Sequence, residues 1–358
     1  MEPFQIHVPD DVLDDLRARV RRTRWPDQIP GIGWQQGTQL EWLQDVVSYW
    51  INEFDWRAWE RRLNALNHFV SNGVHFIYQR AASGGGKPLI LTHGWPGSFL
   101  DYLDMLPALQ NFDVVIPSLP GYGFSRRPPR VGVNYRYVAE RWHKLMTKLG
   151  YPRYCAGGYD FGAGVATILA LDHPESVIAI YLTTLESDLT PLLDDTQLSD
   201  LERAYLAINR SWDTTERGYS AIQSTKPQTI GYALNDSPAG LAAYVGEKWS
   251  SWSDITPPHD FLCATLTLYW VTQTITSSMR DYWDNRWHPV ARPYVATPTG
   301  FGVFAHQTVP EGEPPRSYLE RVYNIQRWTV FPRGGHFAPV EQPAPLAQEL
   351  TAFFHERS

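Results

Sequence analysis

A glycine-rich segment between an apolar strand-like run and a helix-like run constrains the fold of this chain more than any other feature. It reads Gly158-Tyr159-Asp160-Phe161-Gly162, so one carboxylate stands in a setting of small and aromatic residues. A chain that turns sharply from a strand into a helix strains the turn residue, and neighbours with a Cβ would clash there. The helix N-terminus then places its positive end beside the carboxylate. The segment therefore predicts a strand, a strained turn that presents Asp160, and a helix.

Strand-like and helix-like segments alternate along much of the chain. Unbroken apolar runs are typical of strands buried on both faces, and helix-like segments follow them at short spacing. The strand-like runs are at 89–92, 113–117, 154–156, 177–182, 293–300 and 328–331, and the helix-like segments are at 138–149, 165–171 and 346–354. The alternation predicts an α/β fold with a mostly parallel, doubly wound sheet.

The alternation is interrupted in two places, which predicts four sections. Residues 1–80 contain helix-like runs and a hairpin about Asn72-Gly73, and we expect a distinct N-terminal section there. Residues 81–188 and 290–358 carry the alternation and form the two parts of the core. Residues 189–289 lack it, and we expect a helical cap inserted over the sheet. Helices are expected in this cap at 200–212, 239–249 and 261–282.

Composition narrows the cellular setting and the class of partner. The 358 residues carry a net charge of −7 with no basic stripe, which argues against nucleic acid as a partner. Cys155 and Cys263 lie in apolar runs and read as buried free thiols. No apolar run reaches membrane-spanning length, and the first residues lack a charged-then-apolar leader. We expect a soluble, cytoplasmic protein, and the sequence leaves its oligomeric state open, a homo-oligomer included.

The order of two residues along the chain indicates a reaction class. In an α/β-hydrolase the nucleophile comes first and a histidine lies near the C-terminus, and Asp160 and His336 occupy those places. A carboxylate attacks an sp³ carbon that carries a good leaving group or ring strain, and the resulting ester is hydrolysed by water that histidine activates. The backbone N–H groups of Trp95 and Phe161 are the expected oxyanion donors. This chemistry points to epoxide opening or dehalogenation, with no cofactor and no metal.

Further motifs resemble one family, the epoxide hydrolases of the microsomal type, which include the juvenile hormone epoxide hydrolases and soluble bacterial and fungal relatives. The resemblance covers essentially the whole chain. It rests on segments 23–27, 33–34, 54–57, 93–98, 119–125, 218–227 and 234–242. It implies an α/β-hydrolase fold with a meander and a cap, and an enzyme that converts a small hydrophobic epoxide and water to a vicinal diol.

The resemblance also implies roles for two cap tyrosines. Tyr219 matches the first tyrosine that binds the epoxide oxygen in this family, and Tyr282 matches the second. The opened epoxide leaves as an alkoxide, which needs a proton or two strong hydrogen bonds, and phenols that point down from a cap can supply them.

The chain departs from the family pattern at two places. The family usually has Gly-Gly-Asp-Trp-Gly at the turn, whereas Tyr159 and Phe161 flank the aspartate here. Gln307 stands where the family has the acid that supports the histidine, and an amide cannot stabilise an imidazolium by charge. The comparable neutralisation in a Ser-His-Asp enzyme costs about 10⁴-fold in rate. Glu186, just past the strand at 177–182, is our preferred replacement, and Glu311 and Glu313 are the loop alternatives.

Two other functions compete with epoxide hydrolysis. A haloalkane dehalogenase needs N–H donors that hold the halide, commonly a Trp after the nucleophile, and Phe161 cannot serve in that way. A cap tyrosine pair would also be unnecessary there. A ligand-binding relative without catalysis is the other alternative, and Gln307 motivates it.

Overall fold

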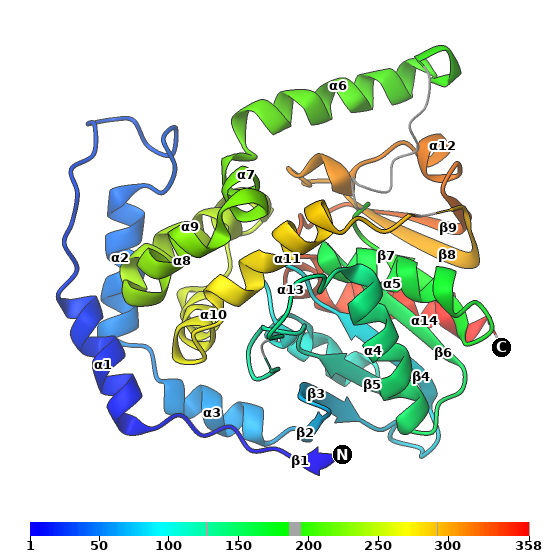
Figure 1. Ribbon diagram of the computed structural model, residues 1–358, viewed down its shortest axis with the longest axis horizontal. Coiled ribbons are helices and arrows are strands. Elements are labelled where there is room, and N and C mark those ends of the chain that lie inside the picture. The colour runs from blue at the N-terminus through cyan, green and yellow to red at the C-terminus, as the bar shows by residue number, and fades with distance from the viewer. Residues whose placement is uncertain (127, 186–194, 292, 358) are drawn as a thin grey trace.

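A single sheet organises the described chain, which covers residues 1–126, 128–185, 195–291 and 293–357 of this computed structural model (Figure 1). Nine strands form it within these residues, in the order β1-β2-β3-β5-β4-β6-β7-β8-β9. Their bounds are β1 Glu2–Pro3, β2 His68–Ser71, β3 Val74–Gln79, β4 Lys87–Thr92, β5 Phe112–Pro117, β6 Tyr154–Gly158, β7 Val177–Leu182, β8 Val295–Phe304 and β9 Tyr323–Phe331.

The sheet is parallel from β5 to β9 and antiparallel at its other edge. Strands β5, β4, β6, β7, β8 and β9 pair in parallel, whereas β1, β2, β3 and β5 pair antiparallel. The β2–β3 turn uses Asn72 and Gly73, both with positive φ (51° and 76°), as the Asn-Gly pair predicted. The mostly parallel sheet confirms the predicted α/β fold.

Helices cover both faces of the sheet, and strands β5 and β6 are therefore buried at every residue. Helices α4 (Tyr135–Lys148) and α5 (Phe161–Asp172) pack together on one face. The 3-10 helix η1 (Phe99–Ala108) contacts α13 (Ala338–Glu341) and α14 (Pro343–His355) on the other. The buried free thiols of Cys155 and Cys263 agree with the sequence prediction. The short elements η3 Asp195–Gln197, η4 Pro310–Gly312 and α12 Arg316–Leu319 complete the second half.

Six α-helices lie between β7 and β8 in the described part of the chain, after the short 3-10 helix η3. They are α6 Asp200–Thr215, α7 Gly218–Thr225, α8 Pro227–Asp236, α9 Pro238–Trp252, α10 His259–Val271 and α11 Ile275–Trp287. The single helix expected at 261–282 was wrong, because α10 ends at Val271 and Gln273 adopts a positive φ of 53° before α11 begins. The Thr272 hydroxyl donates to the Leu268 carbonyl (2.6 Å), which helps end α10. We call α6–α11 the cap helices.

The N-terminal helices support the cap helices from the side (Figure 1). They are α1 Asp10–Arg21, α2 Leu40–Asn52 and α3 Trp56–Asn64. The indole N–H of Trp50 donates to the Thr267 hydroxyl (2.9 Å), and that of Trp59 donates to a carboxylate oxygen of Asp260 (2.9 Å). These bonds hold α10 in place, and α11 continues from it toward the site. Among the described helices, none combines the length and the apolar character needed to cross a bilayer.

Candidate active site

Asp160 stands at the turn from β6 into α5 in a strained backbone conformation. Its φ is 52° and its ψ is −131°, a region that side-chain-bearing residues rarely occupy. The turn is closed by glycine, because a Cβ on Gly162 would lie 1.9 Å from the Thr92 carbonyl oxygen. The Asp160 N–H donates to the Thr184 hydroxyl (2.5 Å), which secures the turn from the end of β7. The strained turn predicted from the sequence is therefore present.

Two backbone N–H groups converge on one oxygen of the Asp160 carboxylate. Trp95 donates to Oδ1 at 2.8 Å and Phe161 donates to the same atom at 2.7 Å. These are the two donors expected from the sequence. The other oxygen, Oδ2, lies 3.4 Å from Nε2 of His336. The carboxylate thus has one oxygen held by amides and one that faces the imidazole.

A buried histidine holds the loop that carries Trp95. The Leu119 N–H donates to Nε2 of His93 (3.1 Å), so the proton of the neutral ring is on Nδ1, which donates to the Gly94 carbonyl (3.0 Å). Burial lowers the pKa of His93 to about 4, which keeps the ring neutral. The motif at 93–98 therefore positions an amide donor and adds no titrating group at neutral pH.

His336 lies in a short loop between β9 and α13, packed under the cap. Its backbone N–H donates to the Trp252 carbonyl (2.9 Å). Its imidazole ring lies edge-on to the rings of Trp252 and Tyr159, with centroids 5.0 and 5.7 Å away. The Glu341 carboxylate accepts the N–H groups of Gly335 and Phe337, both at 3.1 Å, and so fixes this loop. No sequence motif indicated Glu341, because a single glutamate near the C-terminal helix forms no motif of its own.

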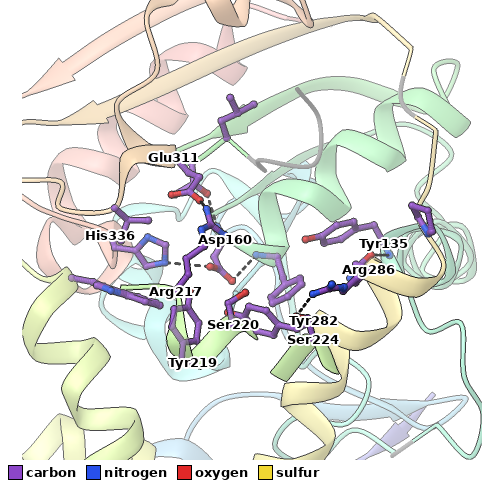
Figure 2. A pocket seen from close by; sticks show the side chains of 17 residues that line it. Tyr135, Asp160, Arg217, Tyr219, Ser220, Ser224, Tyr282, Arg286, Glu311 and His336 are labelled. Carbon is purple, nitrogen blue, oxygen red and sulfur yellow. Dashed lines mark hydrogen bonds and ion pairs between the residues drawn. The ribbon is translucent and has the colours of Figure 1, made fainter. Parts of the chain in front are cut away.

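Tyr219 on α7 and Tyr282 on α11 reach the cavity from the cap side (Figure 2). The Tyr219 ring stacks on the Trp95 indole with centroids 5.4 Å apart, and the Tyr282 ring lies edge-on to Phe161 at 4.8 Å. Burial raises the pKa of Tyr282 well above its usual value, so its phenol is protonated and can donate. Lys248, also missed by the sequence analysis, lies with its Nζ 4.6 Å from the Tyr219 ring centroid.

The residues considered as the acid that supports His336 differ in where they lie relative to the cavity. Gln307 is not hydrogen-bonded to His336 in the described structure: its Oε1 accepts the Val309 N–H (3.3 Å), and the rest of the amide packs against Gly312. Glu186 falls outside the described residues. Glu311 lines the cavity and pairs with Arg217 of the cap, whereas Glu313 does not line it. Nδ1 of His336 is buried and has no partner among the described residues.

A cavity of about 520 Å³ joins these groups under the cap helices. The structure brings five of the predicted site residues to one space, because this cavity is lined by Asp160, Phe161, Tyr219, Tyr282 and His336 (Figure 2). Its wall also contains two arginines, Arg217 and Arg286, which no sequence motif indicated. Arg217, which lies between α6 and α7, pairs with Asp213 at the end of α6 and with Glu311. The arrangement suits attack by a held carboxylate on a carbon whose leaving oxygen faces phenols.

Comparison with known proteins agrees with this geometry. The family model for the epoxide hydrolase N terminus matches residues 1–102, and that for the alpha/beta hydrolase fold matches residues 87–229. A putative epoxide hydrolase of Stigmatella aurantiaca (strain DW4/3-1) is 37% identical over 99% of this chain and 84% of its own length.

Two solved structures share the fold along nearly the whole chain. The epoxide hydrolase of Aspergillus niger superposes with a TM-score of 0.89 at 30% identity and covers 99% of this chain and 96% of its own. The juvenile hormone epoxide hydrolase of the silkworm Bombyx mori has a TM-score of 0.89 at 29% identity and covers 99% of this chain and 94% of its own. With a full-length relative at 37% identity and the α/β-hydrolase fold in place, the chain belongs to the epoxide hydrolase family.

Proposed function

We propose that this protein hydrolyses an epoxide to a vicinal diol through a covalent ester on Asp160. The observation that carries the proposal is that the two oxygens of the Asp160 carboxylate have different surroundings. Oδ1 is held by the N–H groups of Trp95 and Phe161, while Oδ2 lies toward His336 in the wall of the cavity. Oδ2 is therefore the atom that attacks, and Oδ1 becomes the carbonyl oxygen of the ester.

Ring opening needs a proton donor as well as a nucleophile. Asp160 Oδ2 attacks a carbon of the epoxide, a C–O bond of the ring breaks, and the released oxygen takes a proton from Tyr219 or Tyr282. The raised pKa of Tyr282 keeps its phenol protonated until the alkoxide forms, and a tyrosinate left by the transfer regains its proton from water. The product of this step is an ester in which one former epoxide carbon is bonded to Asp160 Oδ2. The neighbouring carbon keeps the former ring oxygen as a hydroxyl group.

Hydrolysis of the ester depends on His336 and on the two amides that bind Oδ1. Water gives a proton to Nε2 of His336 and attacks the ester carbonyl carbon. The negative charge that develops on Oδ1 faces the two amide donors, at distances suited to an oxyanion hole. The tetrahedral intermediate then releases the diol oxygen, which takes the proton from His336 and leaves Asp160 as a carboxylic acid. This acid gives its proton to the neutral His336, which passes it to solvent, and Asp160 returns to its carboxylate form.

The protonated His336 requires a carboxylate to be fully effective, and we propose Glu186 as that partner. Support comes from position in the chain, because Glu186 directly follows Leu185, whose N–H donates to the Glu311 carbonyl (2.6 Å) at the cavity wall. Glu311 is the alternative, since one of its carboxylate oxygens is buried with no partner among the described residues.

Single-turnover hydrolysis in ¹⁸O-labelled water tests the ester route. Enzyme in excess over a reactive terminal epoxide should release unlabelled diol in the first turnover, with ¹⁸O appearing in the peptide that contains Asp160. Label in the first-turnover diol would instead show direct attack by water, and no diol from a broad epoxide panel would favour a ligand-binding protein. The same panel should include chloroalkanes, whose hydrolysis would support the dehalogenase alternative.

A further inference from the structure

We propose that Arg286 binds a carboxylate on the substrate, so that the preferred substrates are epoxides that carry an acidic group at a distance from the ring. This inference rests on the proposed epoxide hydrolysis and adds a substrate class to it. The sequence analysis expected a small hydrophobic epoxide. The cavity wall, however, also contains two arginines, Arg217 and Arg286, to which the proposed reaction assigns no role.

Helix α11 places Arg286 on the same helix face as Tyr282. Tyr282 and Arg286 are four residues apart on α11 (Ile275–Trp287), so their side chains leave the same face of the helix one turn apart. Both line the cavity. Figure 2 shows His336 on one side of Asp160 and Arg286 on the other. A substrate whose epoxide lies between Asp160 and Tyr282 can therefore extend toward Arg286.

The guanidinium of Arg286 is held in place by neutral groups. Its Nη1 donates to the hydroxyl of Ser224, which also lines the cavity, at 3.2 Å. Its Cζ lies 5.3 Å from the Trp287 ring centroid, and the Trp287 indole N–H donates to the Ser224 carbonyl (3.0 Å). These contacts orient the guanidinium and leave its charge intact, which favours a bound anion because less side-chain freedom is lost on binding.

Within the described residues, no carboxylate forms an ion pair with Arg286. The nearby acids of α11 are engaged elsewhere: Asp284 Oδ1 accepts the Gly132 N–H (2.6 Å), and Asp281 is buried beside Tyr122. Arg217, the other arginine of the cavity wall, pairs with both Asp213 and Glu311. Among the described residues, Arg286 is thus the cation of the cavity whose charge is available to a ligand.

The expected effect is moderate, because Arg286 is solvent-exposed at the edge of the cavity. A charge-assisted hydrogen bond at an exposed position is screened by water and salt, and an effect of about 10-fold on kcat/KM is the expected scale. The preference for an anionic substrate should decrease as ionic strength rises. It should be absent for an uncharged substrate of the same shape.

Matched epoxides and matched variants test the proposal. The substrates are 7,8-epoxyoctanoate and its methyl ester, with 5,6-epoxyhexanoate and 9,10-epoxydecanoate to vary the reach. Arg286→Gln should lower kcat/KM for the best acid about 10-fold, mainly through KM, and leave the ester unchanged. Arg286→Lys should recover part of the loss. Arg280→Gln is the control, because Arg280 is an exposed arginine of α11 that bonds to Gln228 and does not line the cavity.

The outcomes separate this inference from the proposed function. If wild-type protein hydrolyses the methyl ester and Arg286→Gln leaves the acid-to-ester ratio unchanged for every chain length, the inference is wrong and epoxide hydrolysis stands. An equal loss with acid and ester in Arg286→Gln also overturns it. If no epoxide is hydrolysed, the proposed function fails, and calorimetric binding of 7,8-dihydroxyoctanoate to wild type and to Arg286→Gln then decides whether Arg286 binds a carboxylate.

Discussion

The rings of Tyr219 and Tyr282 meet edge to face, with centroids 5.8 Å apart and an interplanar angle of 82°. They come from different cap helices, α7 and α11, and both rings also contact the Trp95 indole. Trp95 therefore connects Asp160 to the two tyrosines. Its backbone N–H donates to Asp160, while its indole ring contacts both tyrosine rings. This shared residue sets the spacing between Asp160 and the two tyrosines.

The tyrosine pair should control ring opening. Replacing either tyrosine with Phe keeps the ring contacts and removes one hydroxyl, so ring opening should slow by about 10²-fold, the usual scale for a positioned proton donor. The double variant should nearly abolish it. Rapid-quench measurement of ester formation checks this directly. Tyr232→Phe, an exposed tyrosine of the cap, is the control, and normal ring opening in the double variant would make the pair structural.

Removing the base should separate the two half-reactions. In His336→Gln, attack by Asp160 does not require a base, whereas hydrolysis of the ester does, so the ester should accumulate. Intact-mass measurement after addition of a reactive epoxide should show an adduct, and peptide mapping should place it on Asp160. Asp160→Asn provides the negative control. An adduct on another residue would contradict the assignment of the nucleophile.

The supporting acid can be identified by exchanging charge between two positions. Glu186→Gln should slow ester hydrolysis by more than about 10²-fold on the precedent of catalytic triads, while ester formation changes little. Gln307→Glu in that background should restore part of the rate, because a carboxylate returns to the family position. Glu311→Gln tests the alternative, and Glu313→Gln serves as the control. A silent Glu186→Gln with a strong Glu311→Gln defect would transfer the role to Glu311.

Asp101 should make stability depend on pH. Its carboxyl accepts hydrogen bonds from the Tyr159 hydroxyl at 2.6 Å and the Ser98 N–H at 2.8 Å, and burial raises its pKa from the ordinary 3.8 to about 7. The folded protein therefore holds a proton between about pH 4 and pH 7 that the unfolded chain has lost. This contribution to the free energy of unfolding is present below pH 4 and lost as pH rises through 7. It is on the order of 4 kcal/mol.

Asp101→Asn isolates this effect, because the amide oxygen can still accept both hydrogen bonds. Urea unfolding of wild type and variant at pH 5 and pH 8 should show wild type losing stability relative to the variant as pH rises. A difference between the two proteins that is the same at both pH values would contradict the raised pKa.

Local sequence patterns were sufficient for the features that depend on neighbouring residues. The turn at Asp160, the Asn72-Gly73 hairpin and the apolar strands each follow from short-range sterics and from burial on both faces of a sheet. The order of Asp160 and His336 along the chain then indicated the reaction class, because chain order is tied to the fold. The roles of Tyr219 and Tyr282 came from resemblance alone, since a single tyrosine carries no positional signal.

The sequence by itself therefore determined the fold, and it was enough to propose Asp160 as nucleophile and His336 as base, because these inferences depend on local backbone geometry and on the order of elements. The tertiary structure decided which distant side chains meet: it brought Arg217 to Glu311, Glu341 to the His336 loop, and Arg286 to the cavity wall. It also divided the helix expected at 261–282, because α10 and α11 pack against different partners. Such contacts join residues that are far apart in the chain. They depend on how whole helices and strands pack together, and no short sequence pattern encodes that packing.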